Sequence, residues 1–118
     1  MTKSQWPLIG GKTVEEWDRL WRPVEGGLRH YHPKLRHRAG LYRVSRKGQI
    51  MAIGAGTDRS GGLAKRLSDF RRPNTSGREH YAGRLIYEHR DVLEVEVLIT
   101  GSDSAAREFG LQLKTPMI

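Results

Sequence analysis

Residues 40–54 read Gly-Leu-Tyr-Arg-Val-Ser-Arg-Lys-Gly-Gln-Ile-Met-Ala-Ile-Gly, and this stretch predicts a β-hairpin. Branched and aromatic residues favour extended strands over 41–45 and 49–55. Arg46-Lys47-Gly48 supplies the turn between them, because glycine readily adopts the positive φ that tight hairpin turns require. The hairpin is therefore expected to form the first two strands of a sheet.

The chain beyond the hairpin predicts a helix, a second helix, a strand and a last helix. Apolar residues recur with helical spacing over 63–70 and 82–89, and they alternate with polar residues over 92–100. The last helix is expected after Gly101-Ser102, with Ser102 as its N-cap. This order predicts an α+β fold, in which a small three-stranded sheet is flanked by helices.

The first 38 residues predict a helix followed by an irregular basic arm. Thr13-Val14-Glu15-Glu16 has the spacing of a capping box, and the apolar residues that follow fall on one helical face, which is expected to be buried: Val14, Trp17, Leu20 and Trp21. Pro23 is expected to end this helix, and residues 28–38 are expected to be an irregular connector. We expect residues 1–38 to pack as an N-terminal extension on a core domain formed by residues 39–118.

Length and composition narrow the class of protein. The chain has 118 residues, which fits one domain, and its lack of cysteine excludes disulfides and thiolate metal sites. No apolar run approaches the roughly 20 residues that span a bilayer, and the N-terminus lacks the apolar stretch of a signal peptide. We therefore expect a cytoplasmic protein with no membrane partner.

The net charge of +8 favours a polyanionic partner. Residues 43–78 contain nine basic and two acidic residues, whereas residues 79–118 contain four basic and seven acidic ones. The arm over 28–38 is also basic and contains no acidic residue. This uneven distribution predicts that one part of the surface faces nucleic-acid phosphates.

Four short motifs together resemble the GIY-YIG nuclease family. Gly40-Leu41-Tyr42 resembles the family's first triplet, and Ala52-Ile53-Gly54 matches its second triplet in the last two positions. Arg66 follows on the first helix, and Glu108 lies on the last helix, in the order of the family's arginine and glutamate. The resemblance covers about residues 39 to 118.

The resemblance implies an endonuclease that hydrolyses nucleic-acid phosphodiester bonds, with DNA as the expected substrate. It places Tyr42 near the attacking water, Arg66 at the transition state, and Glu108 on one divalent cation, Mg²⁺ or Mn²⁺. These roles suit the residue types, because an arginine stays protonated beside developing negative charge and a carboxylate binds hard cations. A phenol is a poor base at neutral pH unless a cation lowers its pKa.

Two positions depart from the family pattern. Ala52 stands where the family usually has a second tyrosine, and Phe70 stands where it often has a histidine. Lys65, His80 and Tyr81 are candidate substitutes for the missing tyrosine. The alternative is a catalytically inactive domain that binds nucleic acid or a protein partner.

Other residues have both a functional and a structural interpretation. Tyr42 can be a plain sheet residue, Arg66 a solvated cation, and Glu108 a partner of Arg107 or Lys114. The glycines before the first helix can bind phosphate or simply join two elements, and His30 and His32 are expected to be solvated or to contact phosphate. Basic residues expected to follow a nucleic-acid backbone are Arg59, Lys65, Arg71, Arg72 and Arg78.

Overall fold

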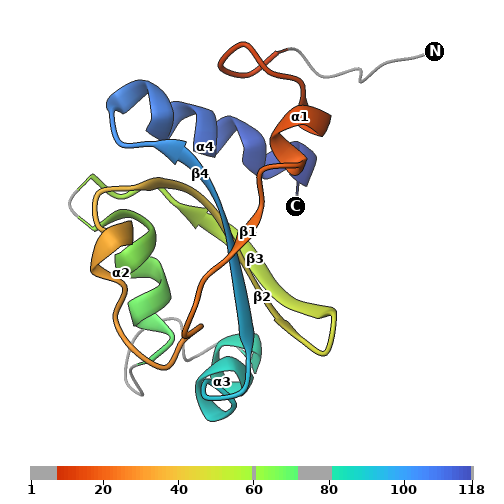
Figure 1. Cartoon of the computed structure of the whole chain (residues 1–118), viewed down its shortest axis with the longest axis vertical. Helices are drawn as coiled ribbons and strands as arrows, with labels where there is room; N and C mark the ends of the chain where they lie inside the picture. Colours follow the sequence, from red (N-terminus) through yellow and green to blue (C-terminus); the bar gives the residue numbers. More distant parts are fainter. Residues whose placement is uncertain (1–7, 60, 72–80, 118) are drawn as a thin grey trace.

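A four-stranded antiparallel sheet forms the centre of the protein, with the strand order β1-β4-β2-β3 (Figure 1). The computed structural model describes residues 8–59, 61–71 and 81–117, and it describes residues 81–84 by their backbone alone. Its strands are β1 (Arg22–Pro23), β2 (Ala39–Arg46), β3 (Gln49–Gly56) and β4 (Glu94–Gly101). Its helices are α1 (Val14–Asp18), the 3-10 turn η1 (Pro33–Leu35), α2 (Gly62–Asp69), α3 (Tyr81–Glu88) and α4 (Ser104–Met117).

The α+β class is confirmed, but the expected three-stranded sheet has a fourth strand. Arg22 and Pro23 pair with Val97 and Glu96 at the outer edge of β4. Proline is tolerated at a sheet edge because its missing N–H removes no bond from the interior of the ladder. The pairing is only two residues long, so the sequence carried no strand pattern there.

The hairpin forms as its sequence predicts. Arg46 pairs with Gln49, and the two residues between them, Lys47 and Gly48, have φ angles of 52° and 82°. Positive φ at both central residues is the geometry of the turn that matches the twist of paired strands. The hairpin thus sets the register that places Tyr42 opposite Gly54.

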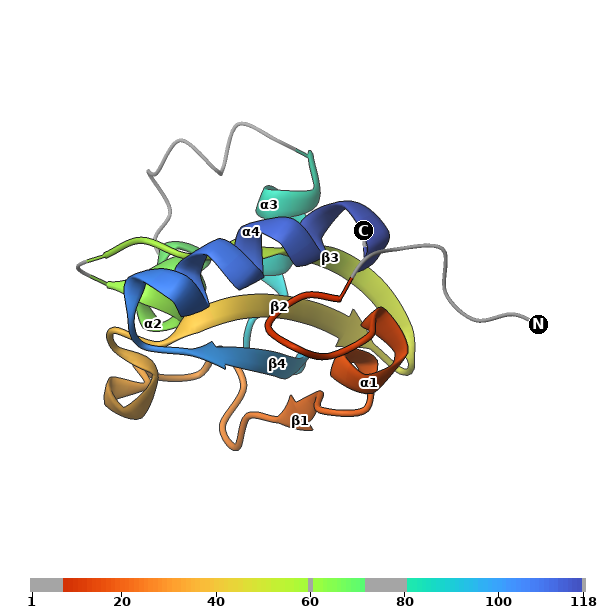
Figure 2. The ribbon, with the colours of Figure 1, turned by 90° about the horizontal axis from the view of Figure 1, so that it is seen from above.

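The two faces of the sheet carry separate hydrophobic cores. The α2-side core contains Leu28, Leu35, Val44, Leu63, Ala64, Leu67, Ile86, Leu93, Val95 and Val97. The α4-side core contains Ile9, Trp17, Leu41, Leu98 and Leu113. Successive strand residues alternate between the faces, and α4 runs across β2 and β4 on its own side (Figure 2).

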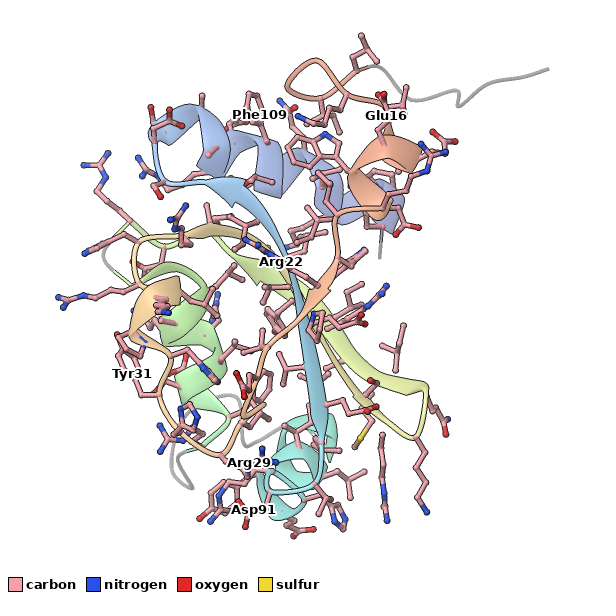
Figure 3. All side chains as sticks on the ribbon, viewed as in Figure 1. Glu16, Arg22, Arg29, Tyr31, Asp91 and Phe109 are labelled. Carbon is pink, nitrogen blue, oxygen red and sulfur yellow. The ribbon has the colours of Figure 1, made fainter. Side chains whose placement is uncertain are left out.

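The N-terminal segment contributes to both cores. Leu28 and Leu35 are buried on the α2 side, and Trp17 is buried on the α4 side. The Trp17 Nε1–H donates to the carbonyl of Ile9 at 2.7 Å, and its ring lies 6.5 Å from that of Phe109, which Figure 3 labels on α4. The segment before residue 39 therefore completes the hydrophobic interior.

Two helix boundaries differ from the expectation. α1 ends at Asp18, and Leu20, which was expected on its buried face, is 44% exposed, because the chain turns there to reach β4. α4 begins one residue later than expected, and Asp103 caps it: its Oδ1 accepts from the Ala106 N–H at 2.8 Å. Ser102 is therefore not the N-cap.

Candidate functional site

Tyr42 lies half-buried on the α2 side of the sheet. A Cβ placed on Gly54 would stand 2.6 Å from the Tyr42 hydroxyl oxygen, so the ring lies directly over this glycine. Phe70, just beyond α2, meets the Tyr42 ring edge-on with centroids 5.7 Å apart. The Tyr42 ring is therefore held between the glycine of β3 and the ring of Phe70.

Arg66 and Tyr42 are close enough to interact electrostatically. Burial raises the pKa of the Tyr42 hydroxyl above its usual value, the Arg66 guanidinium lowers it, and Asp69 raises it again. Burial is the largest of these effects, so the hydroxyl keeps its proton at neutral pH. In this state Tyr42 can donate a hydrogen bond to a phosphate or a water, and it is a weak general base.

Ala52 lies on the same face of the sheet as Tyr42. It pairs with Val44 and packs, partly buried, against the α2-side core. Gly54 follows two residues later on β3, below the Tyr42 ring. A tyrosine at position 52 would thus neighbour Tyr42. With alanine at this position, Tyr42 has no second phenol from residue 52 beside it.

Glu108 is not brought together with Tyr42 and Arg66. It is exposed on α4, two residues before Gly110. Gly110 is buried, and α4 lies against Gly40 and Thr57 at this position. α4 packs on the α4-side core through Leu113, whereas Tyr42 packs on the α2-side core. The carboxylate and the tyrosine–arginine pair therefore belong to opposite layers of the fold.

Asp58 organises the start of α2. Its carboxylate pairs with Lys65 Nζ at 2.9 Å and accepts from the Gly61 N–H at 3.3 Å, while its carbonyl accepts from the Gly62 N–H at 3.0 Å. A carboxylate thus occupies the position where an anion would meet these backbone N–H groups. The structure favours a plain junction over a phosphate-binding loop at this helix start.

The expected nucleic-acid contacts are spread around α2. Arg59 and Lys65 are exposed, and Arg71 is half-buried directly after the helix. Arg72, Arg78 and His80 lie outside the described residues, as does the side chain of Tyr81. Arg43, by contrast, is neutralised on the other face by Glu96 at 2.7 Å.

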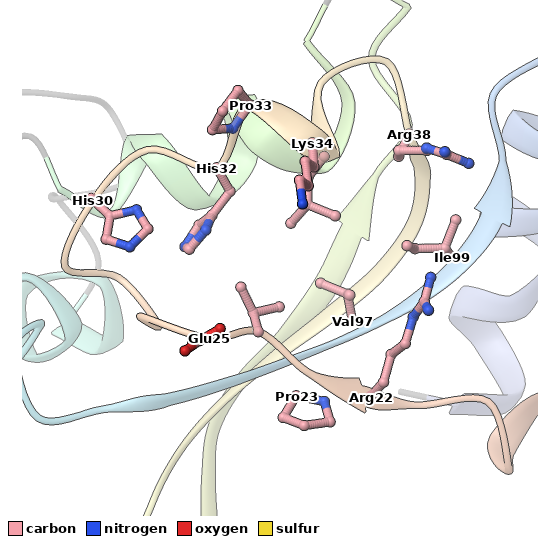
Figure 4. Close-up of a pocket in the computed structure, with 12 residues that line it drawn as sticks. Arg22, Pro23, Glu25, His30, His32, Pro33, Lys34, Arg38, Val97 and Ile99 are labelled. Atoms are coloured by element: carbon pink, nitrogen blue, oxygen red, sulfur yellow. The ribbon is translucent and has the colours of Figure 1, made fainter.

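A pocket on the α2 side of β4 was not anticipated from the sequence. It has a volume of about 550 Å³ and lies between β1, β4 and residues 24–38 (Figure 4). Most of its lining comes from residues 22–38, so we refer to it as the 22–38 pocket. Its basic rim contains Arg22, Lys34 and Arg38. The basic composition of the arm was visible in the sequence, but only the pairing of β1 with β4 brings Arg22 to the same place.

The part of the chain that the structure describes contains few side chains that could bind a metal ion together. Among them, no group of three or more histidine, aspartate or glutamate side chains is arranged to hold an ion. Glu108 alone would suit a cation whose remaining positions are filled by water and substrate phosphate, an arrangement that Mg²⁺ often adopts. Within this same part of the chain, no helix is long and apolar enough to cross a membrane.

Tyr42 and Arg66 thus form the candidate site, with the 22–38 pocket on the same face of the sheet. Tyr42 is paired with Val97, a residue that also lines the pocket. Comparison of the chain with protein-family models, with curated proteins and with solved structures found no match.

Proposed function

We propose that this protein is a GIY-YIG-type endonuclease that hydrolyses phosphodiester bonds in nucleic acid, with DNA as the substrate to test first. The observation that carries the proposal is that the Arg66 guanidinium lowers the pKa of the Tyr42 hydroxyl, with α2 packed on the strand that carries Tyr42. Further support comes from the element order β2, β3, α2, α3, β4, α4. In this order Arg66 on α2 and Glu108 on α4 follow the hairpin as the family's arginine and glutamate do. The proposed site of action is the cytoplasm.

Arg66 would stabilise the negative charge that develops on the phosphoryl oxygens. Its guanidinium is permanently charged and can donate two parallel hydrogen bonds to a phosphate. Tyr42, protonated at neutral pH, would donate a hydrogen bond that positions the phosphate or the attacking water. Glu108 would be the protein ligand of one Mg²⁺ or Mn²⁺, and the bound metal would supply electrophilic activation of a phosphate. Because α4 packs on the other face of the sheet, this role requires the substrate to reach from the Tyr42–Arg66 pair to α4.

A nicking assay on supercoiled plasmid DNA tests this function. The wild-type protein should cut in Mg²⁺ or Mn²⁺ and stop cutting when EDTA is added. Arg66→Ala should lower the rate by about 100-fold or more, because it removes a donor aimed at the transition state. Glu108→Ala should remove the metal-dependent activity.

Matched substitutions control for lost charge. Arg19→Ala removes an exposed cation beside α1, and Glu15→Ala removes an exposed carboxylate on α1; neither should change the cutting rate. Circular dichroism should show that all four variants keep the wild-type secondary structure. A wild type that cuts no DNA or RNA with either metal, or normal cutting by both Arg66→Ala and Glu108→Ala, would refute the proposal.

A second candidate is a catalytically silent domain that binds nucleic acid. The positions of Glu108 and Tyr42 in opposite layers favour it, as does the alanine at position 52. Such a domain would bind in EDTA, with an affinity that falls steeply as the salt concentration rises, since binding releases counterions from the phosphates. Failure to bind DNA or RNA at low salt would instead indicate a protein-interaction module with an acidic partner.

A further inference from the structure

The 22–38 pocket combines an apolar floor with a strongly basic rim. Val24, Val97 and Ile99 form part of the floor, and Leu35 closes it from η1. The volume of about 550 Å³ lies within the roughly 300–1,000 Å³ range of small-molecule sites. The pocket can therefore hold a compact organic group.

The charges of the rim favour an anion at one end. Arg22, Lys34 and Arg38 are exposed, and none of them joins an ion pair within the part of the chain that the structure describes. Figure 4 shows Arg22 and Arg38 on the Ile99 side of the pocket, while Glu25 lies on the opposite side near His30. A phosphate would be attracted to the arginine end and repelled from the glutamate end.

The other end of the pocket is suited to a flat ring. The His30 and His32 rings lie 4.7 Å apart at an interplanar angle of 51°. His32 Nε2 contacts the carbonyl of Gly27, and His30 Nδ1 lies 3.0 Å from the carbonyl of Tyr31, so the backbone orients both rings. Imidazole rings held in this way offer surfaces on which a nucleobase can stack.

A second pocket of similar volume, about 580 Å³, provides a contrast. Its charged lining residues are Arg29, Arg43, Glu94 and Glu96, two of each sign. Arg43 is already paired with Glu96, and Arg29 donates to the carbonyl of Asp91 at 3.4 Å, near the end of the molecule where Figure 3 labels both residues. An anion therefore has no comparable attraction to this second pocket.

We propose that the 22–38 pocket binds one unpaired nucleotide of a nucleic-acid strand. The phosphate would lie at Arg22 and Arg38, and the base would lie over the apolar floor towards the two histidines. Tyr42 and Val97 are cross-strand neighbours, so a bound strand would continue along the same sheet face towards the Tyr42–Arg66 pair. The proposal rests on the proposed function only in taking nucleic acid as the partner, and it requires no cleavage.

Equilibrium binding in EDTA tests the pocket separately from the nuclease. The probes are a fluorescein-labelled 12-nucleotide single strand, adenosine monophosphate, ribose 5-phosphate and inorganic phosphate, each added to the full chain. The single strand should bind, adenosine monophosphate should compete with it, and the two probes without a base should compete at least about tenfold more weakly, because they leave the apolar floor uncovered.

The double variant Arg22→Gln/Arg38→Gln should weaken binding of both the single strand and adenosine monophosphate by at least about tenfold. It should also make the dependence of single-strand affinity on salt shallower by about one phosphate contact, because both arginines face the same phosphate. The matched control Arg19→Gln/Lys114→Gln removes the same charge from the end of α1 and from α4, both on the other side of the sheet, and should have a much smaller effect. Circular dichroism should confirm that both double variants stay folded.

Each contrary outcome overturns a definite part of the proposal. Equal binding by the two double variants would exclude the pocket as the binding site. Equal competition by inorganic phosphate and adenosine monophosphate would exclude base recognition. Binding of adenosine monophosphate without the single strand would identify a free-nucleotide site instead. A protein that binds as proposed but never cuts would refute only the nuclease.

Discussion

Gly54 and Tyr42 are matched to each other across the hairpin. A Cβ at position 54 would stand 2.6 Å from the Tyr42 hydroxyl oxygen and 2.9 Å from the ring carbon that carries it, both closer than atoms can approach without a shift. The Tyr42 ring also meets Phe70, which limits its retreat. The glycine of the second motif is thus explained by the space that the tyrosine of the first motif needs.

Gly54→Ala should lower the free energy of unfolding by about 1–3 kcal/mol, the usual cost of overpacking. Urea denaturation measures this change. Adding Tyr42→Phe, which removes the nearer of the two clashing atoms, should recover part of the loss. If the change in unfolding free energy of the double variant equals the sum of the changes in the two single variants, the two side chains do not interact.

Tyr42 should also affect stability in alkali. Its folded-state pKa is raised, so the folded protein holds the phenolic proton more tightly than the unfolded chain does. This contribution to stability is fully present below the unfolded pKa of about 10 and is lost as the pH rises through the folded pKa. Urea denaturation between about pH 9 and pH 11.5 should therefore show a smaller fall in stability for Tyr42→Phe than for the wild type. Parallel curves would contradict the raised pKa.

At the scale of elements, helix starts are decided by side chains that reach back to the first turn. Asp103 caps α4 through the Ala106 N–H, and Thr13 caps α1 through the Glu16 N–H at 3.1 Å. The capping box at Thr13 was predicted from its spacing, since Thr13 and Glu16 bond each other's backbone. The choice between Ser102 and Asp103 was not predictable, because both residue types cap well and only the path of the chain after β4 separates them.

Asp103→Ala should therefore destabilise the protein by about 1 kcal/mol, the typical cost of a lost N-cap. Ser102→Ala, one residue earlier on the same exposed turn, should change stability by less than about 0.5 kcal/mol. Thermal denaturation of the two variants side by side makes the comparison. A larger loss for Ser102→Ala would show that the cap is misassigned.

At the scale of the whole molecule, the N-terminal arm helps to form the hydrophobic interior. Leu28 is 1% exposed and packs in the α2-side core with residues of α2, β2 and β4. Leu20, only eight positions earlier, is 44% exposed. The two leucines thus form a matched pair within the same segment of the chain.

Leu28→Ala should cost about 2–5 kcal/mol, as expected for a buried leucine whose removal leaves a cavity. Leu20→Ala should cost less than about 1 kcal/mol, because the side chain already meets water. Chemical denaturation measures both variants. Equal costs would mean that the arm does not support the core.

The sequence by itself determined the local features of this protein. Lys47-Gly48 specifies the hairpin turn through its backbone preferences, and Leu63 and Leu67 specify the buried face of α2 through their spacing. The same local patterns gave the α+β class and the candidate residues Tyr42, Arg66 and Glu108. Such features need only the neighbouring residues of the chain.

Only the tertiary structure decided which of these residues meet. Leu41 and Tyr42 are adjacent in the sequence, yet the alternation of β2 sends them to opposite cores, and α4 with Glu108 covers the side that Tyr42 does not face. β1 likewise depends on a partner 75 positions away, because Arg22 pairs with Val97 of β4. The pocket and the layer that holds each candidate side chain depend on this long-range packing, which local propensities do not encode.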